Sequence, residues 1–216
     1  MDSRPVLLIA GCRKYQPFLE AAMKRMRRPG WRVIGLMGDP TLPAPVLNGR
    51  GILTVPVEDT YERLPLKLQA AYTWIYETMP AAAGVFKTDE DILYTVPIDD
   101  VCSYVVDNAP TTDYWGLFVG RCGEAPVSES RIALRFDDKT LRPRHQAAVY
   151  CYGAGYWLSR RALGAIATPT ARAIYAESGL EDVCTGHVLN TAGMFPTKAP
   201  FDYIEVPRDD KLLRLR

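Results

Sequence analysis

Three consecutive acids, Asp89, Glu90 and Asp91, follow a run of apolar residues in the segment FKTDEDILY. Like charges at the end of a buried strand repel one another and lose hydration, so a cation is expected beside them. Residues two apart on a strand face the same side, so Asp89 and Asp91 are expected to point together while Glu90 points away. Carboxylate oxygens suit Mg²⁺ or Mn²⁺, which usually take further ligands from water and a substrate diphosphate. The segment therefore predicts a divalent-metal site, and the alternative is a solvated turn whose acids pair with Lys87 or Arg63.

The segments around the acids alternate between apolar strand patterns and helix patterns. Such alternation indicates one α/β domain with a largely parallel sheet, whose ligands lie beyond the carboxyl ends of the strands. Gly11, Asp39 and the acid cluster each follow a predicted strand, so they are expected to share one rim of the sheet. Strands are predicted over residues 6–10, 31–39, 51–57, 83–89 and 114–120. Helices are predicted over 17–28, 65–79, 97–109 and 180–193, and a glycine-containing turn that passes into a helix over 148–167.

The bulk composition limits the classes of protein to consider. The chain has 216 residues, of which 48% are apolar, enough for a substantial core in one domain. Its 26 basic and 25 acidic side chains give a formal charge of +1, so no global attraction to nucleic acid or a membrane is expected. The early apolar run, residues 6–10, is too short for a membrane span, and no signal peptide pattern is present. Five scattered cysteines without a C-x-x-C pair indicate reduced thiols, so a soluble cytoplasmic protein is expected.

Four segments occur in an order that resembles a known family: EDTYERLPLKLQAAYTWIYE, VFKTDEDILY, YCYGAGYWLSRRAL and LEDVCTGHVL. They are similar to segments of family 31 glycosyltransferases, the group of β1,3-galactosyltransferases, N-acetylglucosaminyltransferases and Fringe. The resemblance spans roughly residues 58 to 190. It implies a single GT-A domain, which is Rossmann-like with a mostly parallel central sheet flanked by helices. It also implies a nucleotide-sugar donor, a divalent metal and inversion at the anomeric carbon.

The resemblance also divides the domain into two working parts. Residues 1–95 are expected to bind the nucleotide, and residues 96–216 to face the acceptor. The chain lacks the membrane anchor of Golgi members, so it is similar to compact bacterial forms and to those of large algal viruses. It is therefore expected in a cytoplasm, including that of an infected host cell.

The resemblance assigns the chemistry to an acidic pair. Inversion in one step needs a carboxylate that takes the proton of the acceptor hydroxyl. Asp182 matches the family position with this role, and Glu181 is the second candidate; the alternative is that both acids only favour a helix N-terminus. His187, about one turn later, is a candidate third metal ligand or a structural histidine. Asp209, Asp210 or water are the other candidates for that ligand.

The donor nucleotide is expected near the first strand. Glycine allows close backbone approach, an arginine can bind phosphate, and a tyrosine offers a stacking face. The alternatives are a surface loop for Arg13 and Tyr15, a turn cap for Asp39, and a solvent-facing helical side chain for Lys67. The residues predicted to contact the donor are Gly11, Arg13, Tyr15, Asp39, Lys67 and Glu90.

The sugar pocket is expected in the segment YGAGYWLS. Its glycines allow close approach, and its aromatic rings can pack on the apolar face of a sugar; the alternative is that the rings belong to the core. The predicted pocket residues are Gly153, Gly155, Tyr156 and Trp157. The basic stretch 121–148 is either an acceptor-side lid or a basic surface.

These assignments favour a metal-dependent inverting glycosyltransferase that uses a UDP-sugar and a glycan or glycoconjugate acceptor. The donor sugar is open between galactose, N-acetylglucosamine and rhamnose. A metal-dependent nucleotidyltransferase or phosphohydrolase is the second hypothesis, and it predicts another metal cluster nearby. A non-catalytic glycan-binding domain is the third, and it would need neither the metal site nor the base.

Overall fold

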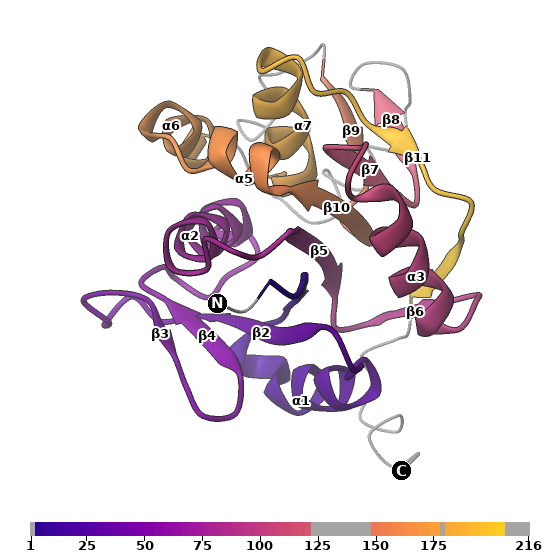
Figure 1. Cartoon of the computed structure of the whole chain (residues 1–216). Helices are drawn as coiled ribbons and strands as arrows, with labels where there is room; N and C mark the ends of the chain where they lie inside the picture. Colours follow the sequence, from indigo (N-terminus) through magenta and orange to yellow (C-terminus); the bar gives the residue numbers. More distant parts are fainter. Residues whose placement is uncertain (1–2, 122–147, 178–179, 206–216) are drawn as a thin grey trace.

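The structure, a computed structural model, describes residues 3–121, 148–177 and 180–205. Its centre is an eight-stranded sheet with the strand order β11-β7-β10-β5-β1-β2-β4-β3 (Figure 1). The strands that run parallel to one another in its middle are β1 (Val6–Ala10), β2 (Arg32–Gly38), β4 (Ile52–Val55) and β5 (Gly84–Asp89). This mostly parallel sheet matches the predicted α/β class.

The sheet continues on the far side of β5 with strands from the second half of the chain. β10 (Gly155–Ser159) runs antiparallel to β5 and to β7 (Tyr114–Gly116), while β11 (Thr197–Lys198) is parallel to β7. At the other edge, β3 (Val46–Leu47) is antiparallel to β4. One sheet therefore spans both predicted parts of the domain, and their assignment to nucleotide and acceptor stays a prediction.

Two short antiparallel ladders flank the main sheet. β6 (Ile92–Tyr94) pairs with β12 (Tyr203–Glu205), and β8 (Val119–Arg121) pairs with β9 (Val149–Cys151). The basic stretch that was predicted as a lid or a surface lies almost wholly in residues 122–147, outside the described residues, as do Asp209 and Asp210.

Helices cover both faces of the sheet (Figure 1). One face packs against α2 (Leu64–Thr78), α5 (Arg160–Ile166), α6 (Pro169–Glu177) and α7 (Glu181–Thr191). The other packs against α1 (Gln16–Arg25), which follows the short helix η1 (Arg13–Tyr15), and α3 (Ile98–Asn108).

Successive side chains along the buried strands point to opposite faces of the sheet and so pack into these two cores. Leu8 and Val85 enter the core beneath α2, whereas Leu7 and Phe86 enter the core beneath α1 and α3. All four side chains are at most 1% exposed, and full burial of such a side chain contributes about 1.5–3 kcal/mol. Because β5 is central in the sheet and buried on both sides, its carboxyl end is held firmly.

Local sequence explains where the helices begin and end. Pro65 lies in the first turn of α2, where the missing amide hydrogen costs no hydrogen bond. α1 ends at Arg25, three residues before its predicted end, and Pro29 restricts the residue before it to extended conformations. The side-chain oxygen of Ser159 accepts a hydrogen bond from the Ala162 amide and caps α5.

The prediction for residues 148–167 missed two strands, β9 and β10. Tyr156 and Trp157 enter opposite cores, so β10 is apolar on both faces and has no alternating pattern to reveal it. The helix α6 was also missed. In the described ranges, no helix has both the length and the apolar character needed to cross a membrane.

The predicted rim of the sheet is present. The first strand pairs with β5 so that Ala10 is opposite Asp89, and the Gly11 amide donates to the Leu36 carbonyl. The Asp39 amide donates to the carbonyl at the end of β4, Val55. The carboxyl ends of β1, β2, β4 and β5 therefore lie side by side.

Candidate active site

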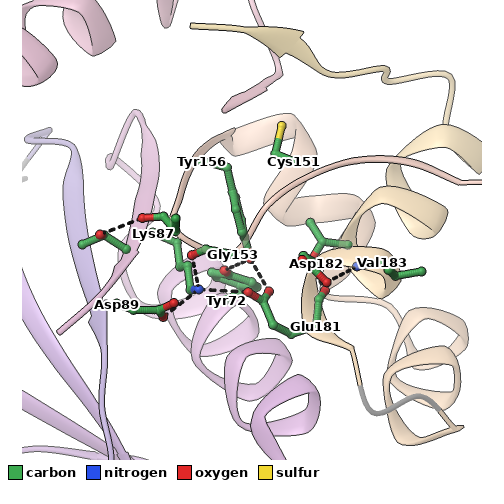
Figure 2. A network of polar contacts seen from close by, with 12 residues as sticks. Tyr72, Lys87, Asp89, Cys151, Gly153, Tyr156, Glu181, Asp182 and Val183 are labelled. Atoms are coloured by element: carbon green, nitrogen blue, oxygen red, sulfur yellow. Dashed lines mark hydrogen bonds and ion pairs between the residues drawn. The ribbon is translucent and has the colours of Figure 1, made fainter. Parts of the chain in front are cut away.

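Lys87 lies at the centre of a buried polar network at the carboxyl end of β5 (Figure 2). Its Nζ is 2.8 Å from Asp89 Oδ1 and 2.9 Å from Glu181 Oε1, and it donates to the Gly153 carbonyl at 2.5 Å. Burial lowers the pKa of a lysine, but these two carboxylates outweigh it and hold the pKa of Lys87 above its usual range. Lys87 is thus one cation that balances the acid cluster.

Asp89 retains one carboxylate oxygen for another ligand. Its Oδ1 bonds Lys87, its side chain is 27% exposed, and its Oδ2 has no partner among the described residues. The strand ends at Asp89, and Glu90 and Asp91 form the turn that follows. The expected alternation of faces therefore does not extend to Asp91. Glu90, which was expected to point away from the two aspartates, is buried and only 5% exposed.

These residues fit a small, substrate-completed metal site. No group of three or more His, Cys, Asp or Glu side chains converges in the part of the chain that the structure describes. Mg²⁺ and Mn²⁺ commonly use only one or two carboxylates and take the other ligands from water and phosphates. Asp89 Oδ2 and the half-exposed Asp91 have the chemistry for this, whereas His187 on α7 does not join them in such a group.

Glu181 connects the network to the aromatic core. Its Oε1 bonds Lys87, and its Oε2 accepts from the Tyr156 hydroxyl at 2.7 Å. The Tyr156 hydroxyl is also 2.7 Å from the Tyr72 hydroxyl of α2. Both oxygens of Glu181 are therefore engaged, and the side chain is 5% exposed. This arrangement suits a positioning role for Glu181.

Asp182 is next along the chain and has a different environment. Its Oδ1 accepts from the Val183 amide at 2.9 Å, and its carboxylate also accepts from the Gly153 amide. Burial, with the charge of Glu181 added, raises the pKa of Asp182 to about 7. A half-buried carboxyl with a pKa near neutrality is suited to accept a proton from a substrate hydroxyl.

Gly153 is the junction between these groups. Its carbonyl binds Lys87 and its amide binds Asp182. A Cβ at this position would lie 2.6 Å from Glu181 Oε1 and 3.3 Å from Lys87 Nζ, so only glycine fits without a shift. The network joins β5, the loop before β10 and the start of α7.

A second polar cluster lies under the loop that follows β1. Lys67 Nζ donates to the Gly11 carbonyl at 2.6 Å and to Asp59 Oδ1 at 2.7 Å, and Asp59 Oδ2 accepts from the Arg13 amide at 2.5 Å. Lys67 is 2% exposed, so it supports the loop rather than facing solvent. Asp59 was not among the predicted site residues, although it lies in EDTYERLPLKLQAAYTWIYE, the first of the four segments that resemble the family.

Above this cluster, Arg13 and Asp39 form an ion pair at the rim. Arg13 Nη2 is 2.7 Å from Asp39 Oδ2, and the arginine side chain is 62% exposed. The hydroxyl and amide of Thr41 donate to Asp39 Oδ1; with Arg13, they lower the pKa of Asp39 to about 2. Asp39 therefore caps a turn and holds Arg13. Tyr15, half-buried, contacts Phe18 edge to face.

The predicted sugar-pocket residues separate into two groups. Gly153 belongs to the polar network, and a Cβ at Gly155 would lie 2.9 Å from Leu117 Cδ1, so Gly155 permits close packing. Tyr156 and Trp157 are both fully buried in the core. Their rings cannot serve as an open platform for a sugar in this structure, in agreement with the core alternative.

Comparison with known proteins identifies the class. The Galactosyltransferase family model matches residues 49–200, more than two thirds of the chain, and this range includes all four ordered segments. The chain therefore belongs to the galactosyltransferase family, a family of hexosyltransferases. The predicted family 31 resemblance and GT-A fold class are confirmed by this match together with the observed sheet.

Individual proteins are also similar to this chain. β-1,3-Galactosyltransferase 4 of Rattus norvegicus is 25% identical over 177 residues, which cover 68% of this chain and 45% of the rat protein. The chain thus spans less than half the length of that relative. Among solved structures, apo mouse xyloside xylosyltransferase 1 has a TM-score of 0.45 at 8% identity. The alignment covers 91% of this chain and 85% of the mouse chain. The apo WbbM bifunctional glycosyltransferase has a TM-score of 0.45 at 11% identity, with 93% and 39% covered.

Proposed function

We propose that this chain is a metal-dependent inverting glycosyltransferase that moves a sugar from a UDP-sugar to a hydroxyl of a glycan or glycoconjugate. The observation that carries the proposal is the position of Asp182, whose pKa is raised to about 7. Gly153 lies between Asp182 and the ion pair of Lys87 with Asp89, because its amide contacts Asp182 and its carbonyl accepts from Lys87. The proposed proton acceptor, Asp182, and the proposed metal ligand, Asp89, thus belong to the same polar network.

The donor is proposed to bind along the rim. Asp89 and Asp91 would hold Mg²⁺ or Mn²⁺, which would neutralise the diphosphate leaving group when bound. The exposed guanidinium of Arg13 is available to the phosphates, and Gly11 allows the backbone to approach the nucleotide. The ion pair of Lys87 with Asp89 fixes the orientation of that carboxylate before a substrate arrives.

The transfer step is assigned to Asp182. The ionised carboxylate takes the proton of the acceptor hydroxyl, and the oxygen attacks the anomeric carbon from the face opposite the diphosphate. The new glycosidic bond forms as the bond to the diphosphate breaks, so the configuration inverts. Glu181 is proposed to position this carboxylate and Lys87, because both of its own oxygens are already engaged.

Further features bear on the donor and on the compartment. The similarity to a β-1,3-galactosyltransferase favours galactose as the first donor sugar to test, ahead of N-acetylglucosamine and rhamnose. Cys12, Cys102, Cys151 and Cys184 form no disulfide among the described residues, and the cytoplasmic setting stays a proposal.

The competing hypotheses make different predictions. A nucleotidyltransferase or phosphohydrolase with two metals needs a second set of metal ligands near Asp89 and Asp91. A glycan-binding domain without catalysis would retain its function when Asp182 is replaced by Asn.

A thermal-shift panel tests the proposal. UDP, GDP, CMP and the UDP-sugars are each added with and without Mn²⁺, because a ligand that binds the native state raises the melting temperature by mass action. The expected result is a shift with UDP that requires Mn²⁺. A shift with another nucleotide alone would overturn the donor assignment, and a UDP shift of equal size without metal would overturn the metal dependence.

A further inference from the structure

We propose that Tyr94 is a positioning residue for the proposed metal site: it holds the turn that carries Asp91 and couples this turn to the loop beside Asp182. This inference deepens the proposed transferase function and rests on it. The Tyr94 hydroxyl donates to Thr88 Oγ1 at 2.7 Å, and Thr88 Oγ1 donates to the Ala154 carbonyl at 3.0 Å. The two hydrogen bonds form a hydroxyl chain that runs from β6 through β5 to the loop before β10.

The turn after β5 is not closed by strand pairing. β6 forms its ladder with β12, and in the described part of the chain β5 and β6 form none with each other. The Glu90 amide donates to the Ala10 carbonyl at 3.1 Å and fixes the start of the turn. Two side chains hold its far side, because the Tyr94 hydroxyl reaches β5 and Arg25 Nη2 of α1 donates to the Ile92 carbonyl at 3.1 Å. The position of the turn therefore depends on side-chain hydrogen bonds as well as on the backbone.

Thr88 connects the turn to the loop on the opposite side of the site. Consecutive residues of a strand point to opposite faces of the sheet, so Lys87 and Thr88 lie on different faces of β5. Lys87 donates to the Gly153 carbonyl, and Thr88 donates to the next carbonyl, that of Ala154. Both side chains are fully buried. β5 therefore holds this loop from both faces, and the Gly153 amide in the same loop contacts Asp182.

The hydroxyl chain lies against an apolar core. The Tyr94 ring contacts Phe86, with centroids 6.2 Å apart, and Phe86 contacts Trp115. Apolar groups of the same shape could fill this space at little cost in stability. Hydroxyl groups add direction, because a hydrogen bond weakens steeply when its angle departs from the preferred range, whereas the hydrophobic effect has no direction. The hydroxyl chain is therefore suited to fix the turn relative to the loop.

The order of the two hydrogen bonds predicts which part of the site each substitution disturbs. Tyr94→Phe keeps the packing of the ring and removes only the bond to the turn, so Thr88 still donates to Ala154. Thr88→Val keeps the shape of the side chain and removes both bonds. Thr88→Ser keeps the hydroxyl, so both bonds are expected to remain.

The first readout is the Mn²⁺ requirement of UDP binding, which needs no turnover. With saturating UDP, the Mn²⁺ concentration that gives half of the maximal thermal shift is measured for each protein. We expect this concentration to rise about tenfold in Tyr94→Phe, the scale of one lost buried hydrogen bond. Tyr175→Phe is the matched control, because the Tyr175 hydroxyl lies 2.7 Å from Thr185 Oγ1 in a buried tyrosine and threonine pair between α6 and α7. The control should leave the Mn²⁺ requirement within about twofold.

Transfer kinetics supply the second readout, with UDP-galactose as donor and a methyl β-D-glycoside as acceptor. At saturating Mn²⁺, kcat should fall about tenfold in Thr88→Val and less, about threefold, in Tyr94→Phe, because the loop beside Asp182 keeps its bond to Thr88 in the second variant. Thr88→Ser should restore kcat and the Mn²⁺ requirement to within about twofold. A purely structural role would lower the melting temperature without this difference between the two readouts.

The outcomes separate this inference from the proposed function. An unchanged Mn²⁺ requirement in Tyr94→Phe, or an equal rise in Tyr175→Phe, would overturn the positioning role of Tyr94 and leave the transferase proposal intact. An unchanged kcat in Thr88→Val would overturn the coupling of the turn to the loop beside Asp182. Failure of UDP and Mn²⁺ to bind the unaltered protein would instead overturn the transferase proposal, and the role of Tyr94 with it.

Discussion

Lys87 Nζ lies 2.9 Å from Glu181 Oε1, so a buried ion pair joins β5 to the start of α7 across 94 positions of sequence. The same ammonium group contacts Asp89, which makes it common to the proposed phosphate side and the proposed acceptor side. Tyr156 and Tyr72 extend the network into the core. Removal of one member is therefore expected to disturb both sides of the site.

Lys87→Met tests this coupling through stability. The substitution leaves two carboxylates near each other without their buried cation, and such a loss typically costs about 3–5 kcal/mol. We expect the free energy of unfolding, measured by urea denaturation, to fall by this amount. Arg50→Met, which removes an exposed pair with Glu20, should change it by less than about 1 kcal/mol. Equal effects of the two substitutions would contradict the central role of Lys87.

Asp182→Asn tests the proposed base. We expect UDP binding to persist in the thermal-shift assay while transfer falls by about 100-fold or more, the usual contribution of general base catalysis. In the unaltered protein, kcat should rise with pH and level off above about 7, because only the ionised carboxylate of Asp182, with its pKa near 7, accepts the proton. The residual rate of the Asn variant should lack this inflection. Near-full turnover in the variant would remove Asp182 from the mechanism.

The same raised pKa makes a prediction about stability. The Asp182 carboxyl has a pKa of about 7 in the folded chain and about 4 when unfolded, so between these values the folded state binds more protons. Stability is therefore lost as the pH rises from about 4 through about 7, because the buried carboxylate must ionise. One pKa unit corresponds to about 1.4 kcal/mol.

The Asp182→Asn variant tests this pH dependence. The difference in free energy of unfolding between the variant and the unaltered protein should be at least about 1 kcal/mol more favourable to the variant at pH 8 than at pH 5. Asp107→Asn, on the exposed side of α3, should show no such change, and an identical pH dependence in the two variants would contradict the assignment.

How far the sequence predicted the fold and site depends on the kind of pattern. The alternation of strands and helices and the shared rim of Gly11, Asp39 and Asp89 were predictable, because parallel strands place their carboxyl ends together. β10 was not, because a short strand buried on both faces has no periodicity. Lys87 was considered only as a partner of the acids; its position two residues before Asp89 on β5 was the signal that both face one side.

Contacts between distant segments could not be predicted from a single sequence. The depth at which Tyr156 is buried depends on Tyr72 and Glu181, which reach it from α2 and α7. Asp59 stands out only when Lys67 is seen beneath the loop after β1. Such partners are set by tertiary packing, which a single sequence does not show. The prediction that the rings of the YGAGYW segment contact a sugar therefore rested on residue types alone.

Lys67→Met tests whether Lys67 supports the loop after β1, which is proposed to bind the nucleotide. The substitution removes hydrogen bonds to the Gly11 carbonyl and to Asp59, and it leaves Asp59 without its buried cation. We expect UDP to bind about tenfold more weakly in calorimetry, because a flexible loop must be ordered on binding. The acceptor KM should change little. Lys24→Met, an exposed lysine of α1, is the control; an unchanged UDP affinity in Lys67→Met would separate this loop from the nucleotide.

Gly153→Ala tests whether the junction tolerates any side chain. A Cβ would lie 2.6 Å from Glu181 Oε1, so either the carboxylate or the loop before β10 must shift. Overpacking of this kind costs about 1–3 kcal/mol, and the shift also moves the amide that binds Asp182. We expect a lower melting temperature and a fall in kcat larger than any change in the UDP affinity. Gly49→Ala is the matched control, because no atom lies within 4 Å of a Cβ placed there. If Gly153→Ala retained both the melting temperature and kcat of the control, the close contact between Gly153 and Glu181 would have no part in holding the site.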